Sequence, residues 1–167
     1  MPNHCFNRVE FYSNDKEEEI KKLHDIFSID VESVDEERTI FGQFIPEPDW
    51  PTTPLAEEDV SYWLHDKRGE VGELPQYVDG AFGKQLRFRS TDRPDDRWYD
   101  WRLQNWDTKW DAYDVVVTDD DPESVEIEFN TAWSPPEAIC SAIREQYPDV
   151  SVSWFYDEPG CEIAGYL

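Results

Sequence analysis

The amino-acid sequence predicts an α+β fold of the ferredoxin-like kind, in which helices cover one face of an antiparallel sheet. Three observations support this prediction. Segments of alternating hydrophobicity, typical of strands, are interleaved with amphipathic segments of helical period. These elements fall into two halves, each with a helix between strands, which is the order of a split βαβ sandwich. At 167 residues, the chain is most simply one domain, residues 1–167.

The first half is expected to contain a strand, a helix and a second strand. Residues 4–12 have strand character. Over residues 16–26, apolar residues recur at helical spacing, and three glutamates lie in the first turn, where the helix dipole favours negative charge. An acidic loop over 29–37 follows. The short apolar stretch 38–45 then predicts the second strand.

A long insertion, at about residues 46–107, is expected to separate the halves. Four prolines within its first nine residues make regular structure there improbable. The insertion is expected to contain five segments in order: an irregular stretch, a short helix, a loop, an edge strand or hairpin arm, and a tryptophan-bearing helix (residues 46–54, 56–65, 69–83, 84–90 and 93–107).

The second half has the clearest pattern. Pro135 and Pro136 are suited to the first turn of a helix, which is expected to run to about residue 147. An acidic turn is predicted at residues 119–123. The alternating segments around these elements predict four strands (residues 113–118, 125–131, 150–156 and 161–166).

Five tryptophans lie within 36 residues, between Trp98 and Trp133. So much ring surface is expected to anchor a core, because soluble monomers rarely expose large apolar patches. Trp106 and Trp110 are four residues apart and are expected to share a helical face toward the sheet, with Lys109 across a ring. The alternative is an exposed platform that binds a peptide or a sugar.

The charge balance is strongly acidic, with 39 Asp and Glu against 15 Lys and Arg and a formal net charge of -24. Phosphates would be repelled, so no direct nucleic-acid partner and no anionic membrane partner are predicted. The charge favours a basic protein partner, divalent cations or a high-salt environment.

The three cysteines, Cys5, Cys140 and Cys161, have no CxxC spacing. They predict free thiols in a reducing cytoplasm, and neither the N-terminus nor any apolar run predicts a signal peptide or membrane span. No cofactor is predicted. The three thiols are too few and too widely spaced for a typical iron–sulfur cluster. A nucleophilic Cys5 with His4 or His65 is disfavoured, because the negative field should raise the thiol pKa.

Acidic residues around the predicted turn raise the question of a metal site. Asp119, Asp120 and Asp121, with Asp111 and Asp114 nearby, offer the oxygen ligands that hard cations prefer. The calcium-loop pattern is absent, however, and a solvated acidic turn explains the run equally well. No metal is therefore predicted.

Four segments in order resemble one family: residues 1–9, 105–112, 131–136 and 156–160. Together they are similar to the YubB-type ferredoxin-like domain family of phage and plasmid proteins. The resemblance implies a ferredoxin-like fold and a mobile-element origin, and it implies no catalytic residue. Two positions depart from it. His4 stands where Trp is expected, and Asp107 stands where Gly is expected. A β-carbon at position 107 disfavours any turn there that requires positive φ, although Asp tolerates such a φ better than most residues.

The leading functional hypothesis is a non-enzymatic accessory protein of the mobile-element type that binds a basic host protein. Its carboxylates would imitate DNA phosphates and block a nucleic-acid enzyme, with charge complementarity speeding association. The candidate binding residues form acidic clusters spread along the chain: Glu17, Glu18, Glu19, Asp35, Glu36, Glu37, Glu57, Glu58, Asp59, Asp95, Asp96, Asp119, Asp120 and Asp121.

Two alternatives remain open from the sequence. The acidic surface is equally expected of a structural or oligomeric module adapted to high salt, since only six Lys stand beside nine Arg. An enzyme of unrecognised type, using a carboxylate or Cys5, would instead require a concave pocket that gathers titratable groups.

Overall fold

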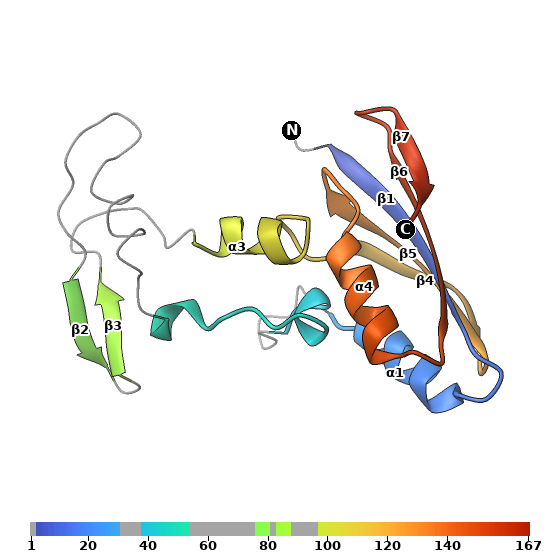
Figure 1. Cartoon of the computed structure of the whole chain (residues 1–167), viewed down its shortest axis with the longest axis horizontal. Coiled ribbons are helices and arrows are strands. Elements are labelled where there is room, and N and C mark those ends of the chain that lie inside the picture. The colour runs from blue at the N-terminus through green and yellow to red at the C-terminus, as the bar shows by residue number, and fades with distance from the viewer. Residues whose placement is uncertain (1–2, 31–37, 54–75, 81–82, 88–96) are drawn as a thin grey trace. The chain divides into compact units, whose positions relative to one another are not determined.

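The computed structural model describes residues 3–30, 38–53, 76–80, 83–87 and 97–167 (Figure 1). The chain divides into two compact units, which are described separately below. Unit 1 comprises Met1–Pro46 and Tyr99–Leu167, and unit 2 comprises Glu47–Trp98. The interpretation of the chain as one domain with an insertion remains a prediction. None of the helices in the described part is both long and apolar enough to cross a membrane.

Unit 1 is built on a five-stranded antiparallel sheet with the order β4-β5-β1-β6-β7. The central strand β1 pairs with β5 on one side and with β6 on the other. The four strands β4-β5-β1-β6 give the ferredoxin-like order, and β7 extends the sheet by one edge strand. The predicted α+β ferredoxin-like fold is confirmed. The strands are β1 (His4–Tyr12), β4 (Tyr113–Asp121), β5 (Ser124–Ala132), β6 (Ser151–Glu158) and β7 (Ile163–Tyr166).

Two helices, α1 (Glu17–Phe27) and α4 (Glu137–Gln146), cover one face of this sheet (Figure 1). Both are amphipathic, and their buried faces follow helical spacing. Between the sheet and the helices, the centroid of the Phe129 ring in β5 lies 5.5 Å from the ring centroids of Phe27 and Trp154. The apolar side chains that the helices bury are Ile20, Leu23, Phe27, Ile139, Cys140 and Ile143.

The predicted strand over residues 38–45 is wrong. This stretch contains a short 3₁₀ helix, η1 (Phe41–Gln43), and the second strand of the ferredoxin-like order is β4. Ile40, Phe41 and Phe44 are all buried, and their spacing suits a single helical turn better than alternation. The Asp111 carboxylate accepts hydrogen bonds from the backbone N–H groups of Ile40 (2.7 Å) and Phe41 (2.9 Å), which fixes this turn.

The helix predicted over residues 93–107 is α3 (Arg97–Asn105), and it ends before Trp106. Trp106 is fully buried, and its indole N–H donates to the Ile45 carbonyl at 3.0 Å. Trp110 lies beyond the helix and is 36% exposed. The prediction that Trp106 and Trp110 share a helical face is therefore wrong, whereas the core role of Trp106 is confirmed.

Two segments that carry the family resemblance, 105–112 and 131–136, meet in space. The Thr108 hydroxyl donates to the Ala132 carbonyl at 3.0 Å and accepts from the Ala132 N–H at 3.2 Å. Asp107 adopts φ 61°, the positive value for which Gly was expected, and Asp tolerates it better than most residues. Its carboxylate accepts the Ala138 N–H at 2.8 Å, in the first turn of α4, a bond that Gly could not form.

Unit 2 contains a second 3₁₀ helix, η2 (Trp50–Thr52), and an antiparallel hairpin of β2 (Gln76–Gly80) and β3 (Gly83–Arg87). β3 agrees with the edge strand or hairpin arm predicted at 84–90, and its pairing with β2 makes it a hairpin arm. β2 replaces part of the loop predicted at 69–83. The Arg97 guanidinium donates to the carbonyls of Thr53 (2.9 Å) and Trp50 (3.0 Å). The helix predicted over 56–65 lies outside the described residues.

Candidate functional site

A groove of about 460 Å³ lies between α1 and the turn that joins β4 to β5. Its walls carry four carboxylates, one lysine and one histidine, with two apolar residues. The excess of carboxylates makes this groove the candidate site. The lining residues are Glu17, Ile20, Lys21, His24, Asp25, Asp120, Asp121 and Pro122.

The helical wall follows from the amphipathic pattern of α1. Ile20, Leu23 and Phe27 face the sheet and are buried. Glu17, Lys21 and His24 are spaced by four and three residues, so they form an adjoining stripe along one side of the helix. Packing of the apolar face against the sheet thus places this polar stripe beside the β4–β5 turn.

The strand wall depends on a register shift in β4, which is an edge strand. Val117 pairs with Ile127, but the next pair is Asp119 with Glu126, so Thr118 is an extra residue. This bulge changes which side chains face the helices. Asp120 is opposite the buried Val125 and therefore points toward α1, whereas Asp119 points to the other face with Glu126.

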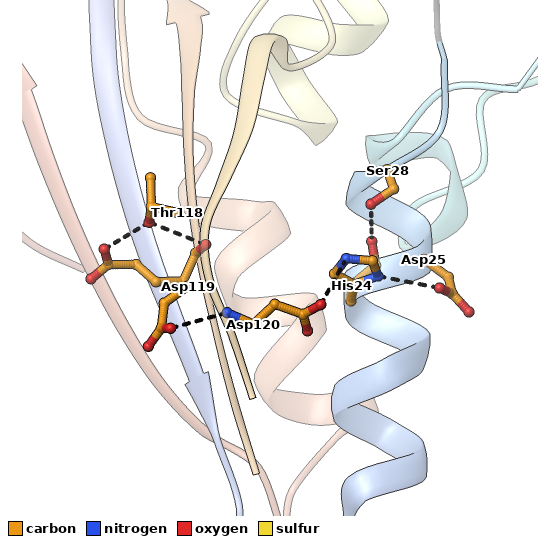
Figure 2. A network of polar contacts seen from close by, with 7 residues as sticks. His24, Asp25, Ser28, Thr118, Asp119 and Asp120 are labelled. Carbon is orange, nitrogen blue, oxygen red and sulfur yellow. Dashed lines mark hydrogen bonds and ion pairs between the residues drawn. The ribbon is translucent and has the colours of Figure 1, made fainter. Parts of the chain in front are cut away.

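His24 connects the two walls (Figure 2). Its Nε2 lies 3.8 Å from Oδ2 of Asp120, and its Nδ1 lies 3.3 Å from Oδ1 of Asp25. The Ser28 hydroxyl donates to the His24 carbonyl at 2.8 Å, at the end of α1. The His24 imidazole thus lies within ion-pair distance of one carboxylate from each wall, Asp25 and Asp120.

A second hollow, of about 430 Å³, lies at the start of α1. Glu17 lines both hollows, whereas Glu18 and Glu19 line this one only. It also contains two lysines, and Lys16 forms an exposed ion pair with Asp149 at 3.5 Å. Both hollows contain four carboxylates, but this one contains two lysines and the groove at the β4–β5 turn contains one, so the groove is the more acidic of the two. The lining residues are Asp15, Lys16, Glu17, Glu18, Glu19 and Lys22.

The structure brings together part of the predicted binding set. Glu17, Asp120 and Asp121 come from two distant acidic clusters and line one groove. All three aspartates lie in β4 and not in the turn predicted at 119–123. Asp119 faces away from the groove because it falls on the face of the sheet that carries its partner Glu126. The remaining candidates lie outside the described residues: Asp35, Glu36, Glu37, Glu57, Glu58, Asp59, Asp95 and Asp96.

Sequence reasoning missed His24, Asp25 and Lys21 as groove residues. The helical spacing of Glu17, Lys21 and His24 was a usable signal, since it places all three on one stripe. Nothing in the sequence indicated that this stripe would lie beside Asp120. That contact depends on sheet order and on the bulge in β4.

Asp111, considered as a cation ligand with Asp119–Asp121, has a different role. It precedes β4, at the opposite end of that strand from Asp121, and its carboxylate binds the backbone of η1. Burial raises its pKa, and the hydrogen bonds from Phe41 and Ile40 act in the opposite direction. Among the described residues, no three or more His, Cys, Asp or Glu side chains are arranged to hold a metal ion.

Cys5 and Cys140 are buried free thiols, and Cys161 is an exposed one. Burial, with smaller contributions from Glu158 and Asp157, raises the pKa of Cys5 to about 11. The negative field expected to disfavour a Cys5 nucleophile is present, but burial is the larger cause. The His4 ring hydrogen-bonds to the Tyr113 hydroxyl, and His65 lies outside the described residues.

These environments predict selective thiol labelling. In the native protein at pH 8, a disulfide reagent such as DTNB is expected to modify one thiol per chain, that of Cys161. Modification should be slower than for a free thiol, because the hydrogen bond to Glu158 raises the Cys161 pKa. In denaturant, all three thiols should react. Fast native reaction at Cys5, detected by peptide mass, would contradict the burial that we describe.

The part of the sheet that forms this site is similar to a domain of known proteins. Residues 105–167 match the family model described as the ferredoxin-like domain in Api92-like protein. This segment of the chain is thus similar to the ferredoxin-like domain of Api92-like protein. The matched segment includes β4, β5, α4, β6 and β7. No curated protein matches the chain.

Among solved structures, the chain is similar to a crystal structure of the protein api92 from Yersinia pseudotuberculosis. The sequence identity is 12% and the TM-score is 0.46, with 99% of this chain and 93% of that chain covered.

Proposed function

We propose that this protein is a non-enzymatic accessory protein that binds a basic protein through the groove between α1 and the β4–β5 turn. The observation that carries the proposal is the meeting of Glu17 with Asp120 and Asp121, from acidic clusters a hundred residues apart, in one concave surface. Asp25 adds a fourth carboxylate, and Lys21 is the one lysine in the lining. A concave acidic surface is complementary to the Arg and Lys side chains of a basic partner.

The finer part of the proposal concerns the kind of partner. A net charge of -24 repels nucleic acid and attracts proteins that bind it. A resemblance to YubB-type proteins of phages and plasmids supports a mobile-element origin, in which blocking a host nucleic-acid enzyme would be useful. We therefore propose that the carboxylates occupy the phosphate-binding surface of such an enzyme, as a DNA mimic.

The test compares two variants with equal loss of charge. The groove variant is Glu17→Gln, Asp120→Asn and Asp121→Asn. The control variant is Glu10→Gln, Asp119→Asn and Glu145→Gln, three exposed positions outside the groove. Asp119 is the sharpest control, because it is adjacent to Asp120 and faces the opposite side of the sheet.

Partners are first captured from a bacterial or archaeal lysate at low and moderate salt, and each purified partner is then titrated with the wild type and both variants. We expect the groove variant to raise Kd at least tenfold at about 50 mM salt, and the control less than about twofold. Duplex DNA should compete with binding. Equal weakening by both variants would contradict the proposal and favour a uniformly salt-adapted surface.

A further inference from the structure

A lysine contacts two exposed tryptophans where the chain approaches β4 and leaves β5. The Lys109 ammonium is 4.2 Å from the ring centroid of Trp110 and 4.0 Å from that of Trp133. Trp110 is 36% exposed and Trp133 is 40% exposed. The Tyr113 ring packs edge-on against Trp110 at 6.1 Å and extends the aromatic surface. These tryptophans therefore do not belong to the core, contrary to the expectation for the tryptophan tract.

The two loops that carry these rings are firmly joined. Thr108 exchanges two hydrogen bonds with Ala132, the residue before Trp133. On the other side of Trp133, the Ser134 hydroxyl donates to the Asp107 carbonyl. The Trp133 N–H donates to the Asn3 carbonyl at 3.0 Å. The two loops are thus fixed relative to each other before any ligand arrives, which lowers the entropic cost of binding between their rings.

Trp133 itself has an unfavourable backbone conformation. Its φ is 73°, a left-handed value that is uncommon for a bulky residue. Such strain persists only where surrounding contacts enforce it, and it gathers at functional sites. Burial of the ring does not explain this strain, because much of the ring is exposed. This conformation goes with a Trp133 ring that lies against the Lys109 ammonium, which also lies over Trp110.

The position of Lys109 shows which chemistry suits the space between the rings. In a chain with 39 carboxylate side chains, no described carboxylate lies within ion-pair distance of this ammonium. It lies over two indole faces, whose negative electrostatic potential attracts cations. Lys109 is thus an internal cation in a two-walled cation–π site.

We propose that Trp110 and Trp133 form a cation clamp that takes an Arg or Lys side chain of a basic protein in place of Lys109. Arg is the better occupant, since its planar guanidinium stacks on aromatic faces. The displaced Lys109 ammonium then becomes free to pair with a carboxylate. The clamp lies at the end of the β4–β5 pair opposite to Asp121 and Ser124, so it is separate from the acidic groove. It goes beyond the proposed function, although both expect a basic partner.

The test uses N-acetyl-arginine amide as the probe, at constant ionic strength, with the indole N–H signals of Trp110 and Trp133 followed by NMR. Lys109→Met removes the internal cation while keeping an unbranched side chain. We expect this variant to bind the probe at least threefold more tightly than the wild type. The neutral N-acetyl-glutamine amide should not bind. Adding Trp110→Leu to Lys109→Met should abolish binding, and it avoids the strained position 133.

The outcomes separate the clamp from the groove. Two results would overturn the clamp and leave Lys109 as a packing residue. One is that the glutamine probe moves the indole N–H signals as much as the arginine probe does. The other is that Lys109→Met does not bind the arginine probe more tightly than the wild type. The groove variant Glu17→Gln, Asp120→Asn and Asp121→Asn should bind the arginine probe as the wild type does. A protein that binds the probe at the clamp, but whose groove variant retains full partner affinity, would support the clamp and contradict the proposed function.

Discussion

Trp106→Ala is expected to lower the free energy of unfolding of unit 1 by about 3–5 kcal/mol, the range for removing a buried large aromatic side chain. Trp106 is fully buried between Phe41 and Trp101, whose rings lie edge-on at 5.8 Å. Its removal also leaves the Ile45 carbonyl without the indole donor and the Arg102 guanidinium without the ring beneath it. The segment around η1 and the helix α3 therefore both lose the side chain against which they pack.

Trp110→Ala is the matched control for this experiment, because it removes an equally large ring four residues away. We expect a loss of about 1 kcal/mol or less, since Trp110 is partly exposed and contacts Lys109 and Tyr113 at the surface. Urea unfolding can be followed by exposure of Cys5 and Cys140, which are both buried in unit 1. Equal losses for the two variants would contradict the assignment of Trp106 to the core.

Asn7→Ala is expected to destabilise the sheet by about 2–4 kcal/mol, a large effect for a polar side chain. Asn7 is fully buried on the helix-facing side of β1. Its amide donates to the Cys5 carbonyl (3.0 Å) and to the Thr131 hydroxyl (2.9 Å), and its oxygen accepts the Trp154 indole N–H (3.1 Å). Alanine leaves that N–H buried without an acceptor and adds a cavity.

Asn7→Leu separates these two causes. Leucine fills the volume but supplies no acceptor, so we expect it to recover only part of the loss. Asn130→Ala is the control, because Asn130 is only half-buried and its amide bonds to the exposed Asp114 at 3.2 Å. Denaturant titration should show a loss below about 1 kcal/mol for that control. Full recovery of stability by Asn7→Leu would mean that β1 requires apolar volume at this position and not the hydrogen bonds.

Much of the fold was predictable because its signals are local. Alternation over β5 and β6 and helical spacing over α1 and α4 reflect which face of each element is buried. The predicted segments agree with these elements to within a few residues. Residues 38–45 were misassigned because short apolar runs fit a strand or a buried turn equally well. The Asp111 carboxylate, seventy residues away, decides between the two.

The candidate site was predictable only in part. Glu17 and the Asp119–Asp121 run were visible as acidic clusters, but the sequence does not say that they meet. Thr118 is decisive for the geometry, because this extra residue turns Asp120 toward His24 and Asp119 away from it. Bulges leave little trace in a sequence, since they depend on how one strand pairs with its neighbour.

The sequence by itself determined the fold class, the positions of most strands and helices, and the strong negative charge on which the proposal of a basic partner rests. These properties follow from composition and from periodicities that each segment carries alone. Only the tertiary structure decided that Trp106 is buried while Trp110 and Trp133 flank Lys109, and that Glu17 lies beside Asp120 in one groove. The physical reason is that burial and proximity are set by sheet order, register and two positive-φ residues, Asp107 and Trp133, which join segments distant in the chain.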